Sequence, residues 1–250
     1  MTAVIVFFVA HWYLSLFSQT FFLHRYSAHK MFIMNKFWER FFYFFTYITQ
    51  GSSYLSPRAY AILHRMHHAY SDTERDPHTP HHTKNVFTMM LKTKDIYNGF
   101  VNNNVQPEAR FDGNVPIWRW LESVGDSWYS RVGWGTAYVL FYIYFVPASA
   151  WYLFLLLPFH FLMGPVHGAI VNWFGHMHGY QNFDNNDKSR NTVFWADWLM
   201  MGELFQNNHH KLPNRLNFAA RWYEFDPTYP IIKTLLLFRI IKLKPSQANA

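Results

Sequence analysis

The chain has 250 residues, of which 50% are hydrophobic, 21% are aromatic and only 15% are charged, with a formal net charge of +7. Ordinary soluble domains carry about 25% charged residues, and this composition excludes disorder, collagen-like repeats and coiled coils. Because the chain has no cysteine, disulfides, thiolate zinc sites, iron–sulfur clusters and cysteine nucleophiles are excluded too.

Two long segments, residues 1–23 and 132–176, contain no Asp, Glu, Lys or Arg. A spanning helix needs about 20 mostly apolar residues. Residues 2–22 therefore predict one membrane crossing, and the second segment predicts two, at about 133–150 and 154–175. The turn between these two is expected at residues 147–149 or at 157–158. The charged blocks 24–131 and 177–250 are both basic on balance, which predicts that they and the C-terminus face the cytoplasm.

The segment 31–56 is rich in aromatic residues, but Lys36, Glu39 and Arg40 interrupt it. Its apolar residues recur at helical spacing, which indicates either an interfacial helix over about 33–55 or a fourth crossing. If the polar clusters on its two sides share one site, it cannot cross alone. We therefore expect one domain over 1–250, an all-α integral membrane protein with three to four transmembrane helices. A cytosolic helical cap, residues 56–131 and 177–250, would hold a dinuclear metal site.

Histidines gather in four motifs: HRYSAH over 24–29, HRMHH over 64–68, NWFGH over 172–176 and QNNHH over 206–210. Each motif lies at the polar end of an apolar segment or just outside it. The candidate metal ligands are His24, His29, His64, His67, His68, His176, His209 and His210, with Asn172 and Gln206 beside them. The remaining histidines are expected to form ordinary hydrogen bonds and to bind no metal. They lie in apolar segments (His11, His160, His167), in a loop (His78, His81, His82) or after the third motif (His178).

The spacing gives these motifs a geometry. At about 100° per residue, His64, His67 and His68 share one helix face, whereas His67 and His68 diverge enough to address two different ions. His24 and His29 are about 140° apart on an α-helix, so they would flank a site or sit where a helix unwinds. Eight imidazoles exceed the ligand set of one ion and imply two metals. Iron, zinc, copper and nickel all bind imidazole.

Each ligand histidine needs a partner that orients its ring through the other ring nitrogen. The carboxylates close enough in the sequence to do this are Asp72, Asp76, Asp187 and Glu203.

The four motifs resemble the histidine boxes of the membrane-bound fatty acyl desaturases, and specifically of the acyl-CoA (stearoyl-type) branch. That family's pattern is HxxxxH, HxxHH, NxxxH and a final HxxHH around a di-iron centre. The neighbouring sequence is similar too, with DPH at 76–78, GY at 179–180 and GE at 202–203. The likeness runs from about residue 22 to 226. It implies spanning helices beneath a cytosolic cap, two Fe ions as cofactors, O2 as co-substrate, and Asn172 meeting its metal through water.

The chain departs from the family pattern twice. Gln206 stands where most acyl-CoA desaturases have His, as it also does in front-end desaturases. Three roles are open for Gln206: it could bind the metal weakly, hydrogen-bond to a water molecule, or change the shape of the site. In addition, one crossing precedes the first motif where the branch usually has two, so the chain is expected to start outside the cytoplasm or to lack the usual first helix.

The resemblance implies a desaturase that inserts a double bond into a saturated acyl chain, of delta-9 type and on acyl-CoA. Phe8 and Trp12, four residues apart on the first apolar helix, are expected to close the end of the acyl tunnel. Arg58, Lys188 and Arg190 are candidates for holding an anionic headgroup or carrier, although solvated surface cations explain them more simply.

Electrons must come from a separate donor such as a ferredoxin or cytochrome b5, because the sequence has no nicotinamide or flavin glycine fingerprint. The other expected partners are the lipid membrane and the acyl substrate, and no nucleic acid is expected.

Three other functions are alternatives to a desaturase. A related di-iron hydroxylase or ketolase on alkyl or carotenoid chains would use much the same ligands. A histidine-rich metal transporter would place its ligands along a path inside the spanning helices, whereas these gather at polar ends. A purely structural membrane protein would not need histidine pairs that recur at matching helical spacing.

Overall fold

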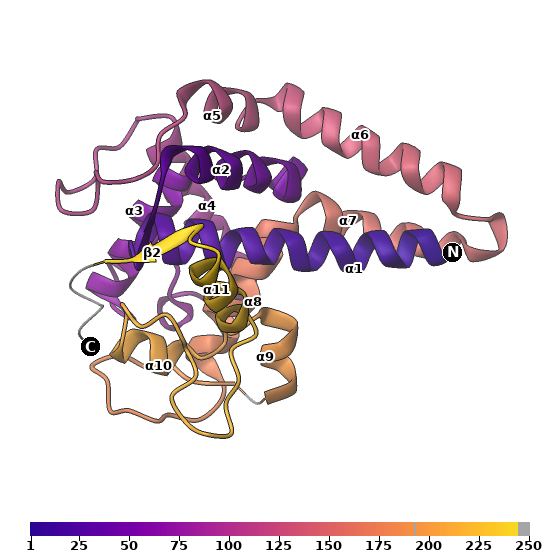
Figure 1. The fold of residues 1–250 in the computed structure, drawn as a ribbon. Coiled ribbons are helices and arrows are strands. Elements are labelled where there is room, and N and C mark those ends of the chain that lie inside the picture. The colour runs from indigo at the N-terminus through magenta and orange to yellow at the C-terminus, as the bar shows by residue number, and fades with distance from the viewer. Residues whose placement is uncertain (193, 245–250) are drawn as a thin grey trace.

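The computed structural model describes residues 1–192 and 194–244, so the last part of the predicted cap, 245–250, lies outside the described residues. The described part is mostly helical, as expected (Figure 1). Its elements, in chain order, are α1 (Thr2–Phe17), the π-helix η1 (Ser18–Ala28), β1 (Phe32–Met34), α2 (Lys36–Gln50), η2 (Gly51–Ser53), α3 (Pro57–Tyr70), η3 (Pro80–His82), α4 (Val86–Val101), α5 (Arg119–Gly125), α6 (Trp128–Phe145), η4 (Ala148–Leu156), α7 (Leu157–Phe161), α8 (Met163–Met177), α9 (Phe194–Met200), α10 (Gln206–Lys211), α11 (Thr228–Leu237) and β2 (Ile241–Leu243).

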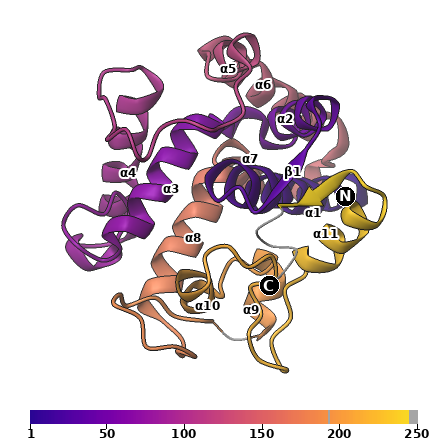
Figure 2. The same cartoon turned by 60° about the vertical axis from the view of Figure 1, so that its left-hand side comes forward.

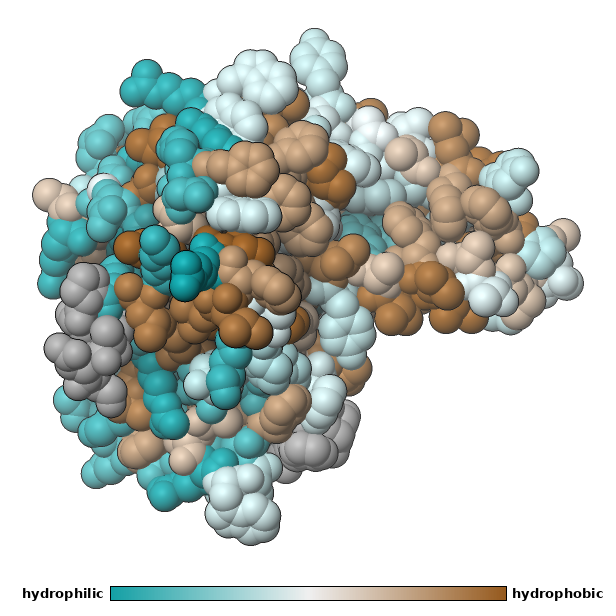
Figure 3. Space-filling view, in the orientation of Figure 1, coloured by the Kyte–Doolittle hydropathy of each residue, from teal (hydrophilic) through white to brown (hydrophobic). Residues whose placement is uncertain are grey.

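The helices divide into a projecting stem and a broader head. Helix α1, α6, η4 and α7 form the stem, and the other elements gather in the head, as the turned view in Figure 2 also shows. Apolar and neutral side chains cover most of the visible stem surface, whereas hydrophilic ones concentrate on the head (Figure 3). The charge-free segments of the sequence thus lie largely in the stem.

The number of helices fit to cross a membrane is smaller than the three to four expected. Among the described residues, one helix, Thr2–Ala28, is long and apolar enough, and a second span is counted if the pair Ala148–Phe161 and Met163–Met177, bent by 73°, is taken as one. Helix α6 has 18 residues, but it begins outside the charge-free segment and includes Arg131. Between α6 and η4 the chain turns at residues 146–147, close to the first of the two predicted turn positions.

Helix α2 is the amphipathic segment between the first two histidine motifs. Asn35 caps its N-terminus by accepting a hydrogen bond from the backbone N–H of Trp38 (3.0 Å). One face buries Phe42 and Tyr43 in the head, while the opposite face exposes Phe37, Phe41, Phe44 and Ile48. An exposed apolar face on a charged helix is the pattern of a segment lying in a membrane interface.

The helix that begins as α1 widens into a π-helix before it reaches the first histidine motif. The backbone N–H of His29 donates to the carbonyl of His24 (3.1 Å), an i→i+5 bond. This wider turn brings residues five apart onto one side of the helix, where an α-helix would separate them. Of the two arrangements expected for His24 and His29, the irregular helix is therefore the one observed.

Candidate metal centre

Four helices carry the eight histidines into the head: η1, α3, α8 and α10. Ser56 is the N-cap of helix α3: its hydroxyl accepts a hydrogen bond from the backbone N–H of Ala59, and Pro57 stands in the first turn. Arg65 fixes α3 against the end of η1 by donating to the carbonyls of Ala28 (2.9 Å) and Ser27 (3.0 Å). These contacts set the HxxHH motif opposite the first motif.

Five imidazoles form one group, in which one ring nitrogen from each lies within 4.8 Å of all the others: His24, His29, His64, His68 and His209. The Nε2 atoms of His29 and His64 are 2.7 Å apart, and that of His68 lies 3.0 Å from His64 and 2.9 Å from His209. Two nitrogens bound at right angles to an ion about 2.1 Å away lie about 3.0 Å apart. The observed spacings are those of neighbouring ligands on one ion.

Three further imidazoles form a second group: His67, His176 and His210. The Nε2 atoms of His67 and His210 are 3.1 Å apart. The Nε2 of His176 is buried without a hydrogen-bond partner among the described residues. The angular divergence of the paired histidines produces this division, because His67 and His210 turn away from their neighbours His68 and His209, as their spacing predicted.

All four carboxylates predicted to orient the rings accept a hydrogen bond from an Nδ1–H. Glu203 accepts from His24 (2.7 Å), Asp76 from His67 (2.8 Å), Asp72 from His176 (3.0 Å) and Asp187 from His210 (2.7 Å). A proton on Nδ1 leaves the lone pair on Nε2. When the three rings of the second group are neutral, their Nε2 lone pairs face inward, where a cation can bind all three.

The charge states follow from burial and from these pairs. Burial, reinforced by the neighbouring imidazoles, holds the pKa values of His64, His68 and His209 well below the usual range, so these rings stay neutral. Burial favours the neutral form of Asp76, but contact with His67 outweighs it and holds the pKa of Asp76 well below its usual range. Burial lowers the pKa of His210 to about 4. Neutral rings and ionised carboxylates are the state that metal binding requires. His67 differs: burial lowers its pKa, but the neighbouring Asp76 outweighs burial and raises it, so a metal would displace a proton from this ring.

Gln206 and Asn172 lie beside the second group. The side-chain amide of Gln206 donates to the carbonyl of Glu203 (2.6 Å). A Cβ added to Gly175 would come within 2.5 Å of Cγ of Gln206, so the glycine permits the close packing of α8 against α10. Asn172 and Gln206 both line a large cavity next to the histidines. Direct coordination by Gln206 and water-mediated contact through Asn172 remain predictions.

A buried ion-pair network supports the first group, and the sequence reasoning missed it. The guanidinium of Arg25 is completely buried and contacts Glu203 (3.1 Å) and Asp226 (2.8 Å). Its Cζ atom lies 3.7 Å from the ring centre of Phe218. Arg25 thereby neutralises and positions the carboxylate that orients His24. The signal in the sequence was an arginine directly beside a ligand histidine, but nothing in the sequence pairs it with residue 226.

Two of the histidines expected to have no metal, His11 and His160, meet in the stem, and a third, His167 on α8, packs against Trp12 of α1. The Nδ1 atoms of His11 and His160 are 2.6 Å apart, and the hydroxyl of Tyr142 lies 2.9 Å from Nε2 of His160. The ring of Trp12 stands edge-on to His167 at 4.5 Å. His11 and His160 thus contact each other. Nε2 of His11 and both ring nitrogens of His167 are buried without a hydrogen-bond partner among the described residues, so the expectation that ordinary hydrogen bonds satisfy His11 and His167 is wrong.

The loop histidines lie near the second group. His78 is buried and its ring centre is 4.3 Å from that of His67. His81 contacts the carbonyl of His176 (3.2 Å) and His82 contacts that of Asp72 (3.1 Å). One ligand atom each from His67, Asp76 and His78 also lie within 4.8 Å of one another, a grouping that the sequence did not suggest.

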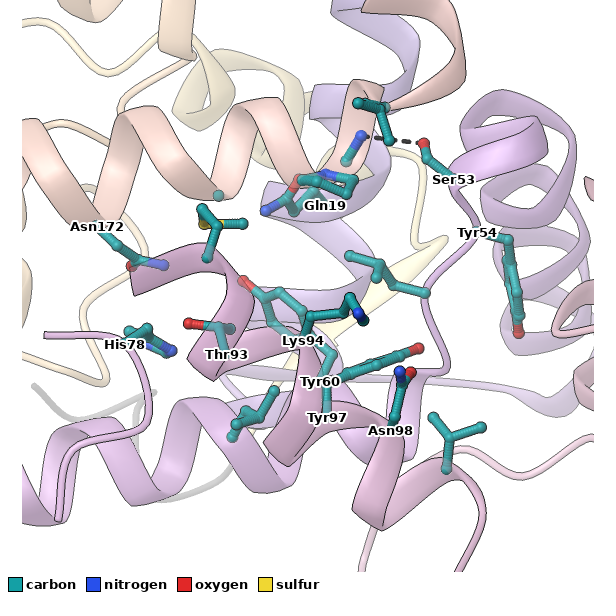
Figure 4. A pocket seen from close by; sticks show the side chains of 18 of the residues that line it. Gln19, Ser53, Tyr54, Tyr60, His78, Thr93, Lys94, Tyr97, Asn98 and Asn172 are labelled. Carbon is teal, nitrogen blue, oxygen red and sulfur yellow. Dashed lines mark hydrogen bonds between the residues drawn. The ribbon is translucent and has the colours of Figure 1, made fainter. Parts of the chain in front are cut away.

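A cavity of about 1020 Å³ opens beside both histidine groups. Its inner wall includes His64, His67 and Gln206, and its outer wall comes from α4, the start of α6, and α7–α8. Figure 4 shows His78 and Asn172 at one end of this space and Tyr54 and Asn98 toward the other. Most of its surface is apolar, as expected of a pocket that holds an apolar ligand and excludes water from the site.

Phe8 and Trp12 are not among the described residues that line this cavity. Phe8 packs edge-on against Phe159 and His160, and the indole of Trp12 donates to the carbonyl of Leu199 (2.9 Å). Their role at the end of an acyl tunnel stays a prediction. The truncation Trp12→Ala tests it: a longer preferred acyl chain supports the role, and an unchanged product profile contradicts it.

The three cations proposed for a headgroup also lie outside the described cavity lining. Arg58 forms an ion pair with Asp112 (2.5 Å), and the backbone N–H of Lys188 donates to the carboxylate of Asp72 (2.8 Å). The backbone N–H of Arg190 donates to the carbonyl of Gly175 (2.7 Å). Lys188 and Arg190 thus border the second histidine group through their main chains.

Comparisons with known proteins agree with this geometry. A family model described as "Fatty acid desaturase" matches residues 1–242. The "Delta-9 desaturase-like 5 protein" of Arabidopsis thaliana is 28% identical over 237 residues, which cover 90% of this chain and 70% of that protein. The "sn-1 stearoyl-lipid 9-desaturase" of Synechocystis sp. is 29% identical over 244 residues, 91% of this chain and 68% of that protein. The "Hex-5-enoyl-[acyl-carrier protein] acetylenase" of Moorena producens is 25% identical over 90% of this chain and 71% of that protein.

Proposed function

Because the chain belongs to the fatty acid desaturase family, we propose that it is an oxygen-dependent acyl desaturase with a histidine-ligated di-iron centre. The single observation that carries the metal centre is the second group of histidines. Its three inward Nε2 lone pairs are held there by carboxylates on the opposite side of each ring. The residues fit a metal ion, and the five-imidazole group fits a second one. The names of two relatives, a delta-9 desaturase-like protein and a stearoyl-lipid 9-desaturase, support the delta-9 position.

The proposed reaction removes two hydrogens from adjacent methylenes. The saturated chain, O2, two electrons and two protons yield the alkene and two waters. Two irons supply the oxidising power, which no protein side chain has at ordinary pKa values. The residues of this chain do the rest: eight imidazoles hold the metals, four carboxylates orient the rings, and the apolar cavity positions the acyl chain and keeps out bulk water.

We further propose that the stem lies in the membrane, with the histidine groups and the C-terminus on the cytoplasmic side. The charge-free segments and the exposed apolar face of α2 support this placement. Under it the first helix, α6 and the bent pair would make the crossings, and α2 would lie in the interface. Electrons would come from a separate ferredoxin or cytochrome b5, and the net charge of +7 favours docking of an acidic donor.

The test is a product analysis in a bacterium stripped of its own desaturases, with an electron donor supplied. Gas chromatography and mass spectrometry of the acyl chains should show a new monoene with the intact chain and none with His67→Ala. The matched control is His178→Ala, since His178 is exposed and belongs to neither group. A monoene formed equally by His67→Ala would refute the site.

The same analysis separates the alternative chemistry. A hydroxylated or oxo product in place of the monoene would assign the chain to the di-iron hydroxylases or ketolases. Absence of any product from a membrane preparation that holds two irons and an active donor would contradict acyl oxidation altogether.

A further inference from the structure

The outer part of the cavity has an apolar rim. Five apolar residues that line it are strongly exposed: Phe87 and Leu91 on α4, Trp128 and Val132 on α6, and Leu162 at the corner between α7 and α8. Their exposed fractions run from 54% for Leu162 to 78% for Trp128. The exposed polar residues of the lining, Lys94, Asn98 and Asn102, follow them toward the end of α4. The five apolar side chains offer an apolar ligand an apolar surface between the start of α4 and the stem helices.

The rim lies at the junction of stem and head. Val132 is the first residue of the second charge-free segment, and Trp128 and Tyr129 precede it with their side chains exposed. Exposed Trp and Tyr at the end of an apolar segment are typical of the level of lipid headgroups. The cavity would then open at the boundary between the lipid headgroups and the hydrocarbon, so that an acyl chain could enter it directly from the membrane.

The charges around the opening do not suit a polyanionic carrier. Of the described residues that line the cavity, only Lys94 and Arg131 carry a permanent positive charge. Arg131 is held by Asp126 (3.3 Å) and by the carbonyl of Ser52 (3.0 Å). Lys94 is 62% exposed and its contact with the exposed Asp95 (3.6 Å) is screened by solvent, so it is one accessible cation. Coenzyme A brings several phosphate charges, and an acyl carrier protein is acidic, so either needs a cluster of free cations.

Polar neutral groups stand next to the rim. Asn98 and Asn102 follow Lys94 on the cavity side of α4, and Figure 4 shows Lys94 and Asn98 pointing toward the same space. Amides and one lysine suit the ester and glycerol oxygens and the single phosphate of a phospholipid, whose remaining parts stay in the membrane. The apolar rim and the shortage of free cations thus favour the same carrier.

We propose that the acyl chain enters sideways through the rim formed by Phe87, Leu91, Trp128, Val132 and Leu162 while it is still esterified in a membrane phospholipid. This refines the carrier within the proposed desaturase function and rests on that function. It replaces the acyl-CoA that the sequence resemblance implied.

The test offers two acyl pools to one purified full-length protein. The protein is reconstituted with its irons and an electron donor in nanodiscs of phospholipid with uniformly ¹³C-labelled palmitoyl and stearoyl chains. Unlabelled palmitoyl-CoA and stearoyl-CoA are added in solution. Because no acyltransferase is present, the mass of each monoene reports the pool from which it came. The proposal expects ¹³C monoene in the phospholipid. Unlabelled monoene as the main product overturns the proposal but keeps the desaturase, and no monoene from either pool contradicts the desaturase itself.

A substitution in the rim tests the entry route independently. Leu91→Lys places a charge in the apolar rim and should lower the yield of ¹³C monoene about fivefold, the scale set by a charged side chain near a membrane interface. If acyl-CoA were the carrier, the added cation would instead maintain or raise turnover. The matched control is Trp222→Lys, which changes an exposed residue outside the cavity lining, 95% exposed in the wild type. An undiminished ¹³C yield in Leu91→Lys would refute entry through the rim.

Discussion

The carboxylates behind the histidines allow a sharp test of the second metal site. In Asp76→Asn the side chain keeps its size but loses the ionised oxygen that accepts from Nδ1 of His67 at 2.8 Å and from the backbone N–H of Asp72 at 2.9 Å. Loss of such a ring-orienting partner typically costs about 10–100-fold in metal affinity. This corresponds to about 1.4–2.8 kcal/mol. Asp187→Asn should act in the same way through His210.

The assay is metal content after equilibration with a graded series of a chelator, read by elemental mass spectrometry on purified protein. Wild-type protein should keep two irons per chain up to the highest chelator concentrations. Both variants should fall to one iron at 10–100-fold lower chelator and then hold at one, because the five-imidazole group contacts neither carboxylate. Asp95→Asn is the control, since the side chain of Asp95 is 75% exposed and contacts no histidine.

Two results would refute the reasoning. If Asp76→Asn and Asp187→Asn keep both irons with wild-type affinity, these carboxylates do not orient the ligands. If both irons leave together, the two groups are not separate sites.

Four further predictions use other parts of the structure. Gln206→His should keep both irons and retain the more weakly held one at higher chelator, because it adds an imidazole beside a group that has only three; weaker retention than in wild type would count against this. Arg25→Met should lower the free energy of unfolding by about 3–5 kcal/mol, because it leaves two buried carboxylates without their cation; thermal unfolding in detergent measures this, and an unchanged midpoint would contradict it. Burial raises the pKa of Asp126 to about 6, so wild type should lose about 2 kcal/mol of stability relative to Asp126→Asn as pH rises from 4 to above 6, and parallel stability curves would be the contrary result. Gly168→Phe should shorten the preferred acyl chain, since a Cβ there meets nothing within 4 Å and the residue lines the cavity; an unchanged product profile would show that the chain lies elsewhere.

The sequence alone determined the features that depend on neighbours along the chain. The absence of charge over 1–23 and 132–176 indicated where the apolar helices lie, because such segments are solvated poorly by water. The HxxHH spacing assigned His67 and His68 to different groups, because 100° per residue is a property of the α-helix itself. The nearby carboxylates were found in the same way, since a ring and its partner often lie within one motif or its flanks.

The tertiary structure decided whatever depends on residues distant in the sequence. Arg25 meets Asp226 across 201 positions and His11 meets His160 across 149, and no local pattern encodes either pair. The cavity is likewise made by α4, α6 and α8 together, so its apolar rim and its few cations were invisible in the sequence. Helical periodicity is set by local backbone sterics, whereas the packing of these helices depends on the shape and burial of the whole chain. For that reason the sequence could predict which histidines are candidate metal ligands but not the cavity that lies beside them.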